Sequence, residues 1–354
     1  MNPAPPRLVV AAPLGGPAGA RLRPMLRTLS GMLPVLFLTA RRMDADLAPG
    51  PALTLDEWRG REDLAFLPHL HVLADDAAAE AALRAALFRP GHVLLADPGL
   101  ARLYRAITAG QGRPAAWRRS AAEAHGPAAR RLVGSALEPA ALRLMPMLEA
   151  ATAGALSLSL LHPGALPGLA PGHAARLLPP AFPEAPALSR AEARAALGLG
   201  EGPHVLLPMA GPARLRALRA AVTAADANPI LPDSRGEEGS LSPIAADAVL
   251  ALDLPLSAWD QPLLEQAMAA GTPILAWAEG PDAEHWPEPA VMRLGFAPVE
   301  TAIAPVTAAL RALLASPAPR GLAARQHAAA HGPHVLARRI LDGIPGCRVM
   351  SPAP

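Results

Sequence analysis

Apolar residues occur along the chain in short continuous runs, which alternate with longer segments of helical periodicity. Runs such as Arg7–Ala12 and Val35–Thr39 are typical of strands buried on both faces, as in a parallel sheet. Segments such as Arg21–Leu33 place apolar residues three and four positions apart, which is the spacing of one helix face. The pattern therefore predicts an α/β protein in which strands and helices alternate.

The same pattern continues through both halves of the chain. Further strands are predicted at His71–Ala74, His92–Ala96, Ala155–Leu160, Leu177–Pro180, His204–Pro208 and Asn228–Pro232. Further helices are predicted at Ala77–Phe88, Leu100–Thr108, Leu137–Ala151 (kinked at Pro146), Ser189–Leu197, Ala302–Leu314 and Gly321–Ile344, the last broken at Gly332-Pro333. Arg41–Arg61 is expected to be a polar connection.

The segment Ala245–Gly280 predicts a strand, a helix and a second strand. Ala248–Leu252 is a continuous apolar run, and Asp260 can cap the helix that follows. Gly271 suits the left-handed position that ends a helix, and Ile274–Trp277 is the next apolar run. A crossover this short joins neighbouring parallel strands.

The wording of this segment resembles the retaining glycosyltransferases of the GT-B type, the group-1 or family-4 class. The matching residues are Ala246-Asp247, Leu263-Leu264-Glu265 and Ala267–Pro273. The resemblance implies two Rossmann-like domains that face each other across a cleft, with a C-terminal helix crossing back to the first domain. In that family the glutamate of this helix holds the ribose of a nucleotide sugar, which implies this role for Glu265.

The expected domain boundaries follow from the resemblance and from a proline-dense linker at Pro179–Pro186. An N-terminal, acceptor-side domain is expected over residues 1–180, and a C-terminal, nucleotide-sugar-side domain over 187–325. Residues 326–354 would form the crossing helix and a tail. Ser189 and Glu192 have the spacing of a capping box at the start of the second domain, and Gly198 can end that helix.

Candidate residues of the first domain follow its predicted strands. Gly15 and Gly16, with Arg21, resemble the double-glycine loop that faces the acceptor in GT-B enzymes, although a tight connection alone explains two glycines. Asp97 ends a strand, where α/β sheets bind ligands, and Asp before Pro is also a good turn. His125 is the second catalytic candidate. Relatives have a histidine at the position closest to Ser120, and a helix-end histidine is the alternative.

The donor-binding candidates lie in the second domain. The resemblance places the donor diphosphate over the helix start that follows Asp260, where free N–H groups and the helix dipole favour anions. In relatives an arginine and a lysine also bind this diphosphate. The expected donor-binding set is Gly211, Arg214, Arg216, Asp260, Glu265 and Thr272. Arginines that simply face solvent are the alternative for Arg214 and Arg216.

Two departures from the family pattern open a second interpretation. The family has another glutamate eight residues before the helix glutamate, and here that position is Ser257. The chain has no lysine, so arginine or backbone N–H groups must hold any phosphate. The first hypothesis is a metal-independent glycosyltransferase with a nucleotide-sugar donor, no other cofactor, and an unidentified saccharide, lipid-linked or protein acceptor. The alternative is a catalytically degenerate GT-B-like binding or partner subunit.

Composition excludes several other classes. The net charge is only +2 and aromatic residues make up 3% of the chain, which argues against nucleic-acid binding. The glycine fingerprint of nicotinamide dehydrogenases is absent, and an epimerase remains a third hypothesis. The single Cys347 excludes an internal disulfide framework. No run is long enough for a transmembrane segment, so a cytoplasmic location is expected, with peripheral attachment to the inner membrane left open. The acidic loop Pro281–Pro289 is expected to be solvated, with no metal.

Overall fold

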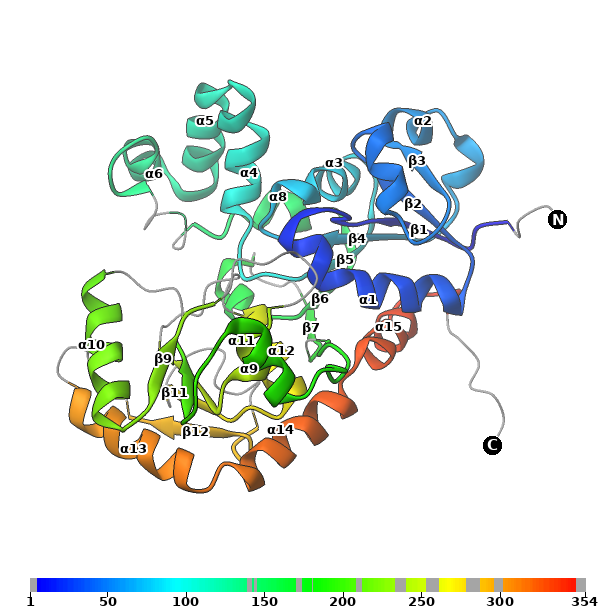
Figure 1. Cartoon of the computed structure of the whole chain (residues 1–354). Helices are drawn as coiled ribbons and strands as arrows, with labels where there is room; N and C mark the ends of the chain where they lie inside the picture. The colour runs from blue at the N-terminus through cyan, green and yellow to red at the C-terminus, as the bar shows by residue number, and fades with distance from the viewer. Residues whose placement is uncertain are drawn as a thin grey trace. The chain divides into compact units, whose positions relative to one another are not determined.

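The chain forms two compact units in the computed structural model (Figure 1). One unit comprises Met1–Pro180 with Pro333–Pro354, and the other comprises Ala181–Gly332. The structure describes residues 5–138, 142, 145–169, 174–179, 181–207, 212–232, 240–252, 261–277, 287–295 and 302–347.

The first unit is built on a seven-stranded sheet in the order β3-β2-β1-β4-β5-β6-β7. Every neighbouring pair is parallel. Strands β1, β2, β4 and β5 are buried along their whole length, which explains their uninterrupted apolar character. The strands are Leu8–Ala11 (β1), Val35–Thr39 (β2), Ala52–Thr54 (β3), His69–Leu73 (β4), Gly91–Leu95 (β5), Ala155–Leu160 (β6) and Ala175–Leu177 (β7).

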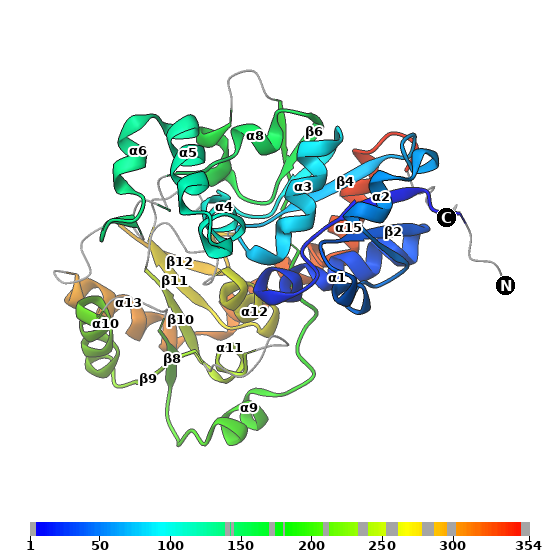
Figure 2. The ribbon, with the colours of Figure 1, turned by 90° about the horizontal axis from the view of Figure 1, so that it is seen from above.

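Helices connect these strands, as parallel pairing requires. The α-helices are Gly16–Met32 (α1), Leu55–Arg59 (α2), Glu80–Phe88 (α3), Ala101–Ile107 (α4), Pro114–His125 (α5), Pro127–Leu132 (α6) and Glu149–Thr152 (α8). Short 3-10 turns are Arg42–Leu47 (η1), Glu62–Leu64 (η2), Ala77–Ala79 (η3), Ala109–Gln111 (η4) and Pro163–Gly168 (η5). The C-terminal helix Pro333–Asp342 (α15) packs against α1, and Figures 1 and 2 both place the two side by side.

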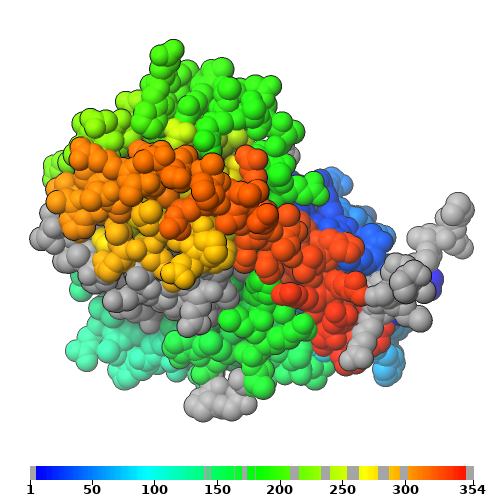
Figure 3. Space-filling view, turned by 90° about the horizontal axis from the view of Figure 1, so that it is seen from below, coloured from blue at the N-terminus to red at the C-terminus, as the bar shows by residue number. Residues whose placement is uncertain are grey.

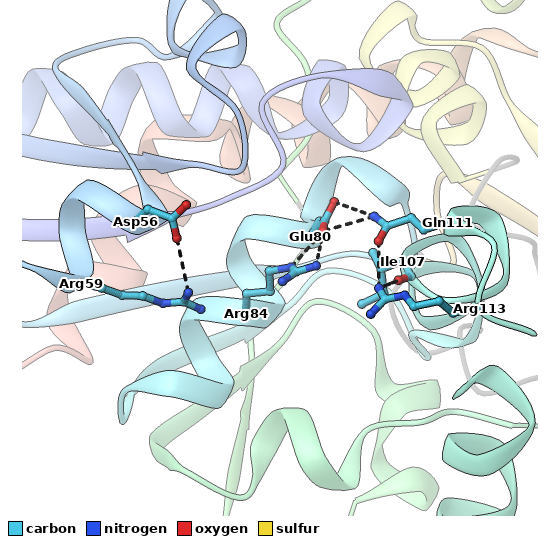
Figure 4. A network of polar contacts seen from close by, with 7 residues as sticks. All are labelled: Asp56, Arg59, Glu80, Arg84, Ile107, Gln111 and Arg113. Atoms are coloured by element: carbon cyan, nitrogen blue, oxygen red, sulfur yellow. Dashed lines mark hydrogen bonds and ion pairs between the residues drawn. The ribbon is translucent and has the colours of Figure 1, made fainter. Parts of the chain in front are cut away.

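A polar network links α3 to the connection between α4 and α5 (Figure 4). Glu80 accepts hydrogen bonds from Arg84 at 2.9 Å and from Gln111 at 3.3 Å. Arg113 then donates to the Gln111 side chain and to the Ile107 carbonyl. The same view includes the exposed Asp56–Arg59 pair on α2. Exposed pairs of this kind contribute little to stability, about 0–1 kcal/mol each.

The second unit is built on a five-stranded parallel sheet in the order β12-β11-β10-β8-β9. The strands are His204–Leu206 (β8), Asn228–Ile230 (β9), Ala248–Ala251 (β10), Ile274–Trp277 (β11) and Val291–Leu294 (β12). The helices are Arg190–Leu197 (α9), Pro212–Ala224 (α10), Ser242–Ala245 (α11), Gln261–Ala270 (α12), Ile303–Ala315 (α13) and Ala318–Ala330 (α14).

Alternate residues of the central strands enter two different cores. Val249 of β10 packs with residues of α12 and α14, whereas Leu250 packs with residues of α10 and α13. The second unit therefore has three layers, with a sheet between two pairs of helices. Figure 3 shows α13 and α14 (orange) forming a continuous surface over this unit. Each buried valine or leucine contributes about 1.5–3 kcal/mol.

The strand–helix–strand interpretation of Ala245–Gly280 is confirmed where the structure describes it. Strands β10 and β11 pair in parallel, and Gly271 ends α12 with a φ of +75°. The capping box at Ser189 is present, with both reciprocal hydrogen bonds to Glu192. The break at Gly332-Pro333 separates α14 from α15.

Four sequence predictions need correction. Leu137–Ala151 is not one helix, because Met145–Leu148 is non-helical and only Glu149–Thr152 forms a helical turn. Met147 has a φ of +54°, which a right-handed helix does not allow. Arg41–Arg61 contains strand β3 and helix α2, which begins with a capping box at Thr54. Helix α1 begins at Gly16, five residues before the predicted start, and β12 was not predicted.

No helix among the described residues is both long enough and apolar enough to cross a bilayer.

Candidate functional site at the strand ends

The carboxyl ends of β1, β4 and β5 lie at one edge of the first sheet, because these strands are neighbours and parallel. The β1 end leads through Leu14 and Gly15 into α1. Gly16 is the first residue of α1 and has a φ of +64°, a conformation that favours glycine. A Cβ on Gly19 would stand 2.5 Å from the backbone carbon of Leu14. These glycines therefore let the loop lie directly against its own helix.

Arg21 and Asp97 form a buried ion pair at this edge. A guanidinium nitrogen of Arg21 lies 2.9 Å from Asp97 Oδ1, and the side chains are 9% and 4% exposed. Asp97 Oδ2 accepts the backbone N–H of Asp75 at 2.8 Å. The same Arg21 nitrogen donates to the Ala96 carbonyl. Both oxygens of Asp97 are thus engaged in joining α1 to the ends of β4 and β5, which favours the structural alternative for this candidate.

Asp75 follows β4 and was not among the candidates taken from the sequence. Its Oδ1 accepts the backbone N–H groups of Arg102 at 2.7 Å and Leu103 at 3.1 Å, at the start of α4. Burial raises the pKa of Asp75 to about 7, although these hydrogen bonds act in the opposite direction. The strand-end argument that selected Asp97 applies equally to Asp75 and could have found it.

Asp76 is the second residue at this edge that sequence reasoning missed. Its Oδ1 accepts the N–H of Ala78 at 2.8 Å, and its Oδ2 accepts the N–H of Ala18 in α1 at 3.4 Å. A Cβ on Gly16 would lie 3.2 Å from Asp76 Oδ2. The carboxylate of Asp76 is therefore held against the N-terminal turn of α1.

His125 is the last residue of α5, so the segment where the family has a strand is helical here. Its Nε2 lies 3.4 Å from the backbone nitrogen of Met147, and burial lowers its pKa. The preceding Pro146 accepts the backbone N–H of Leu100, just after β5. His125 therefore fixes a segment that packs beside the Asp97 turn. No described hydrogen bond joins His125 to Asp97.

In the second unit, α12 carries the glutamate that the resemblance singles out. Glu265 is 4% exposed, on a helix whose Leu264, Ala267 and Met268 enter the core beside β10. A carboxylate this well buried needs polar partners, whether within the protein or on a ligand.

Most other residues that carry the resemblance stabilise the fold. Thr272 is fully buried and its hydroxyl donates to the Pro243 carbonyl at 2.8 Å, so this hydroxyl is not available to a donor and the expected binding role is corrected. Asp247 pairs with Arg190 and Arg194 of α9 and accepts the N–H of His204. It therefore joins α9, β8 and β10.

The remaining donor candidates are only partly described. Arg216 is exposed on α10. Gly211, Asp260 and the side chain of Arg214 lie outside the described residues. Ser257 and residues 281–286 of the acidic loop lie outside them as well. Within the described ranges, no group of three or more His, Cys, Asp or Glu residues is arranged to hold a metal ion.

No protein-family model matches the sequence, and no curated protein is similar to it. Solved structures do resemble the chain. Sucrose-phosphate synthase from Thermosynechococcus elongatus is 14% identical with a TM-score of 0.55, over 95% of this chain and 97% of that one. Anabaena Alr3699/HepE in complex with UDP and glucose is 10% identical with a TM-score of 0.56, over 95% and 98%.

WaaG, a glycosyltransferase involved in lipopolysaccharide biosynthesis, is 15% identical with a TM-score of 0.50, over 96% of this chain and 99% of that one. Each similarity covers both Rossmann-like units and nearly the whole of each partner. At such low identity the comparison establishes the fold, and the chain has the two-domain α/β fold of GT-B glycosyltransferases.

Proposed function

We propose that the protein is a glycosyltransferase that moves a sugar from a nucleotide-sugar donor to an acceptor. The observation that carries this proposal is the similarity over about 95% of the chain to glycosyltransferases, one of which was solved with UDP-glucose. A ligand site at strand ends is the usual arrangement in open α/β sheets. Two such units provide one sheet edge for each substrate.

The donor is proposed to bind the second unit, with its ribose hydroxyls accepted by Glu265. The burial of this carboxylate supports the assignment, because a hydroxyl pair would satisfy oxygens that are removed from water. Residues that follow β10 lead into the N-terminus of α12, where backbone N–H groups favour a diphosphate. Arg216 supplies an exposed guanidinium in the same unit. These groups would stabilise the leaving diphosphate without a metal ion.

The acceptor is proposed to bind at the edge of the first unit formed by the Gly15-Gly16 loop and the ends of β4 and β5. The glycines bring the backbone close to this edge, and the Arg21–Asp97 pair holds the loops in place. Asp75 adds a carboxyl group whose raised pKa suits proton exchange with a hydroxyl near neutral pH.

The alternative of a degenerate binding or partner subunit is supported by the replaced motif residues. Ser257 stands where relatives have a glutamate, and no lysine is present to hold a phosphate. Such a protein could still bind a nucleotide sugar without transferring the sugar.

Thermal unfolding with UDP-, GDP- and ADP-sugars tests donor binding. A ligand at one hundred times its Kd stabilises a protein by about 2.7 kcal/mol. We expect one nucleotide class to raise the Tm of the parent and to leave that of Glu265→Gln unchanged. Glu201→Gln removes the same charge from an exposed position of the second unit and should behave as the parent does.

Circular dichroism of Glu265→Gln without ligand checks that the buried substitution leaves the fold intact. Equal stabilisation of Glu265→Gln and the parent would show that the ribose assignment is wrong. If no nucleotide sugar stabilises the parent at millimolar concentration, the transferase proposal itself fails. Release of free nucleotide in the presence of an acceptor separates transfer from binding alone.

A further inference from the structure

Helix α1 has seventeen residues and begins without a cap of its own. Its N-cap position is Gly15, which has no side chain, and no acidic residue occurs in its first turn. The unpaired N–H groups and the dipole of such a helix end attract an anion. In many α/β proteins that anion is a phosphate group of the ligand.

Here a carboxylate of the protein already occupies this position. Asp76, which follows β4, places Oδ2 against the N–H of Ala18 and is held from the other side by the N–H of Ala78. Gly16 makes the approach possible, because a Cβ at that residue would lie 3.2 Å and 3.3 Å from the two carboxylate oxygens. The helix end is thus neutralised by a residue 58 positions later in the chain.

The surrounding charges do not reverse this effect. Asp75 and Asp97 are neighbours of Asp76 at the same edge, and the guanidinium of Arg21 is paired with Asp97. Arg42, on η1, acts on Glu57 of α2, whose pKa it helps to lower. A phosphate that approached the N-terminus of α1 would therefore meet carboxylates, at an electrostatic cost that increases as water is displaced.

We propose that Asp76 is a specificity-determining residue that excludes phosphate groups from this edge, so that the substrate bound here presents neutral hydroxyl groups. In naming that substrate as the acceptor, the inference rests on the proposed function. The exclusion of phosphate does not depend on transfer and can be tested by binding alone.

The first experiment measures the binding of inorganic phosphate to the full chain. Phosphate and chloride buffers of equal ionic strength are compared by thermal unfolding and by 31P line broadening at pH 7.5. The parent should unfold at the same temperature in both buffers. Asp76→Ala removes the carboxylate, and we expect its Tm to rise by a few degrees in 20 mM phosphate, with saturation.

Asp56→Asn is the matched control. It removes one negative charge from α2, where the Asp56 side chain is 93% exposed, and should remain insensitive to phosphate. If Asp76→Ala does not fold, Asp76→Asn keeps an oxygen for the Ala78 N–H and is used instead. Phosphate binding to the parent as strong as to the variant would overturn the proposal. A folded variant that gains no phosphate binding would overturn it equally.

The second experiment compares neutral and phosphorylated acceptors, such as glucose and glucose 6-phosphate, with the donor that stabilises the protein. The parent is expected to favour the neutral member at least tenfold in kcat/KM, and Asp76→Asn to reduce this preference. A parent that prefers the phosphorylated member would refute the inference. Absence of product with every acceptor counts against the transferase proposal, and phosphate binding still decides the role of Asp76.

Discussion

Replacing Asp97 distinguishes a residue that holds the candidate site together from one that reacts with substrate. Asp97→Ala removes the carboxylate that pairs with Arg21 at 2.9 Å and accepts the N–H of Asp75 at 2.8 Å. Hydrogen bonds to charged groups contribute about 1.5–3 kcal/mol each. Breaking a buried pair costs about 3–5 kcal/mol, because the other charge stays buried. We expect a loss of about 3–5 kcal/mol.

The loss should be visible in both thermal and urea unfolding. The first unit contains roughly 200 residues, for which each kcal/mol lowers the Tm by about 2–4 °C, so a decrease of about 6–20 °C is expected. Replacing both members, as in the double variant Arg21→Met with Asp97→Ala, removes the unpaired charge and should recover most of this loss. The coupling between the two substitutions measures the pair directly.

A different pattern would refute this reasoning. If Asp97→Ala unfolds within 1 °C of the parent, the pair does not stabilise the first unit. If it also abolishes transfer, Asp97 is a catalytic residue, as first expected from the strand end. Asp97→Asn keeps the size of the side chain and should fall between the parent and Asp97→Ala in stability.

Two further predictions concern stability. Asp247→Ala should destabilise the second unit by about 2–3 kcal/mol, because α9 loses its ion pairs and the His204 N–H loses its acceptor; urea unfolding checks this, and an unchanged midpoint would contradict it. Burial lowers the pKa values of His69 and His71 to about 4, so the unfolded chain binds more protons between pH 6.5 and 4. Each histidine should therefore remove about 1.4 kcal/mol of stability per pH unit as the pH falls through this window, and a double variant, His69→Phe with His71→Leu, should show a smaller loss.

Local sequence patterns predicted those parts of the fold that depend on neighbouring residues. The continuous apolar runs identified β2, β6 and β11 at their observed boundaries, because a strand buried on both faces has no polar positions. The capping box at Ser189 and the glycine at position 271 likewise depend on only a few adjacent residues. Where a distant contact determined the local conformation, as at Met147 beside His125, the helical pattern was misleading.

The candidate site shows the same division more sharply. The sequence alone determined the fold class, the parallel strand–helix alternation and the strand-end position of Asp97, since these follow from periodicity and from turn residues. Only the tertiary structure decided that Asp97 is held by Arg21 and that Thr272 is committed to Pro243. It also placed Asp76 at the start of α1, 58 residues away from Ala18. The partners of a buried polar group come from whichever strands and helices pack beside it, and a linear pattern does not record that proximity.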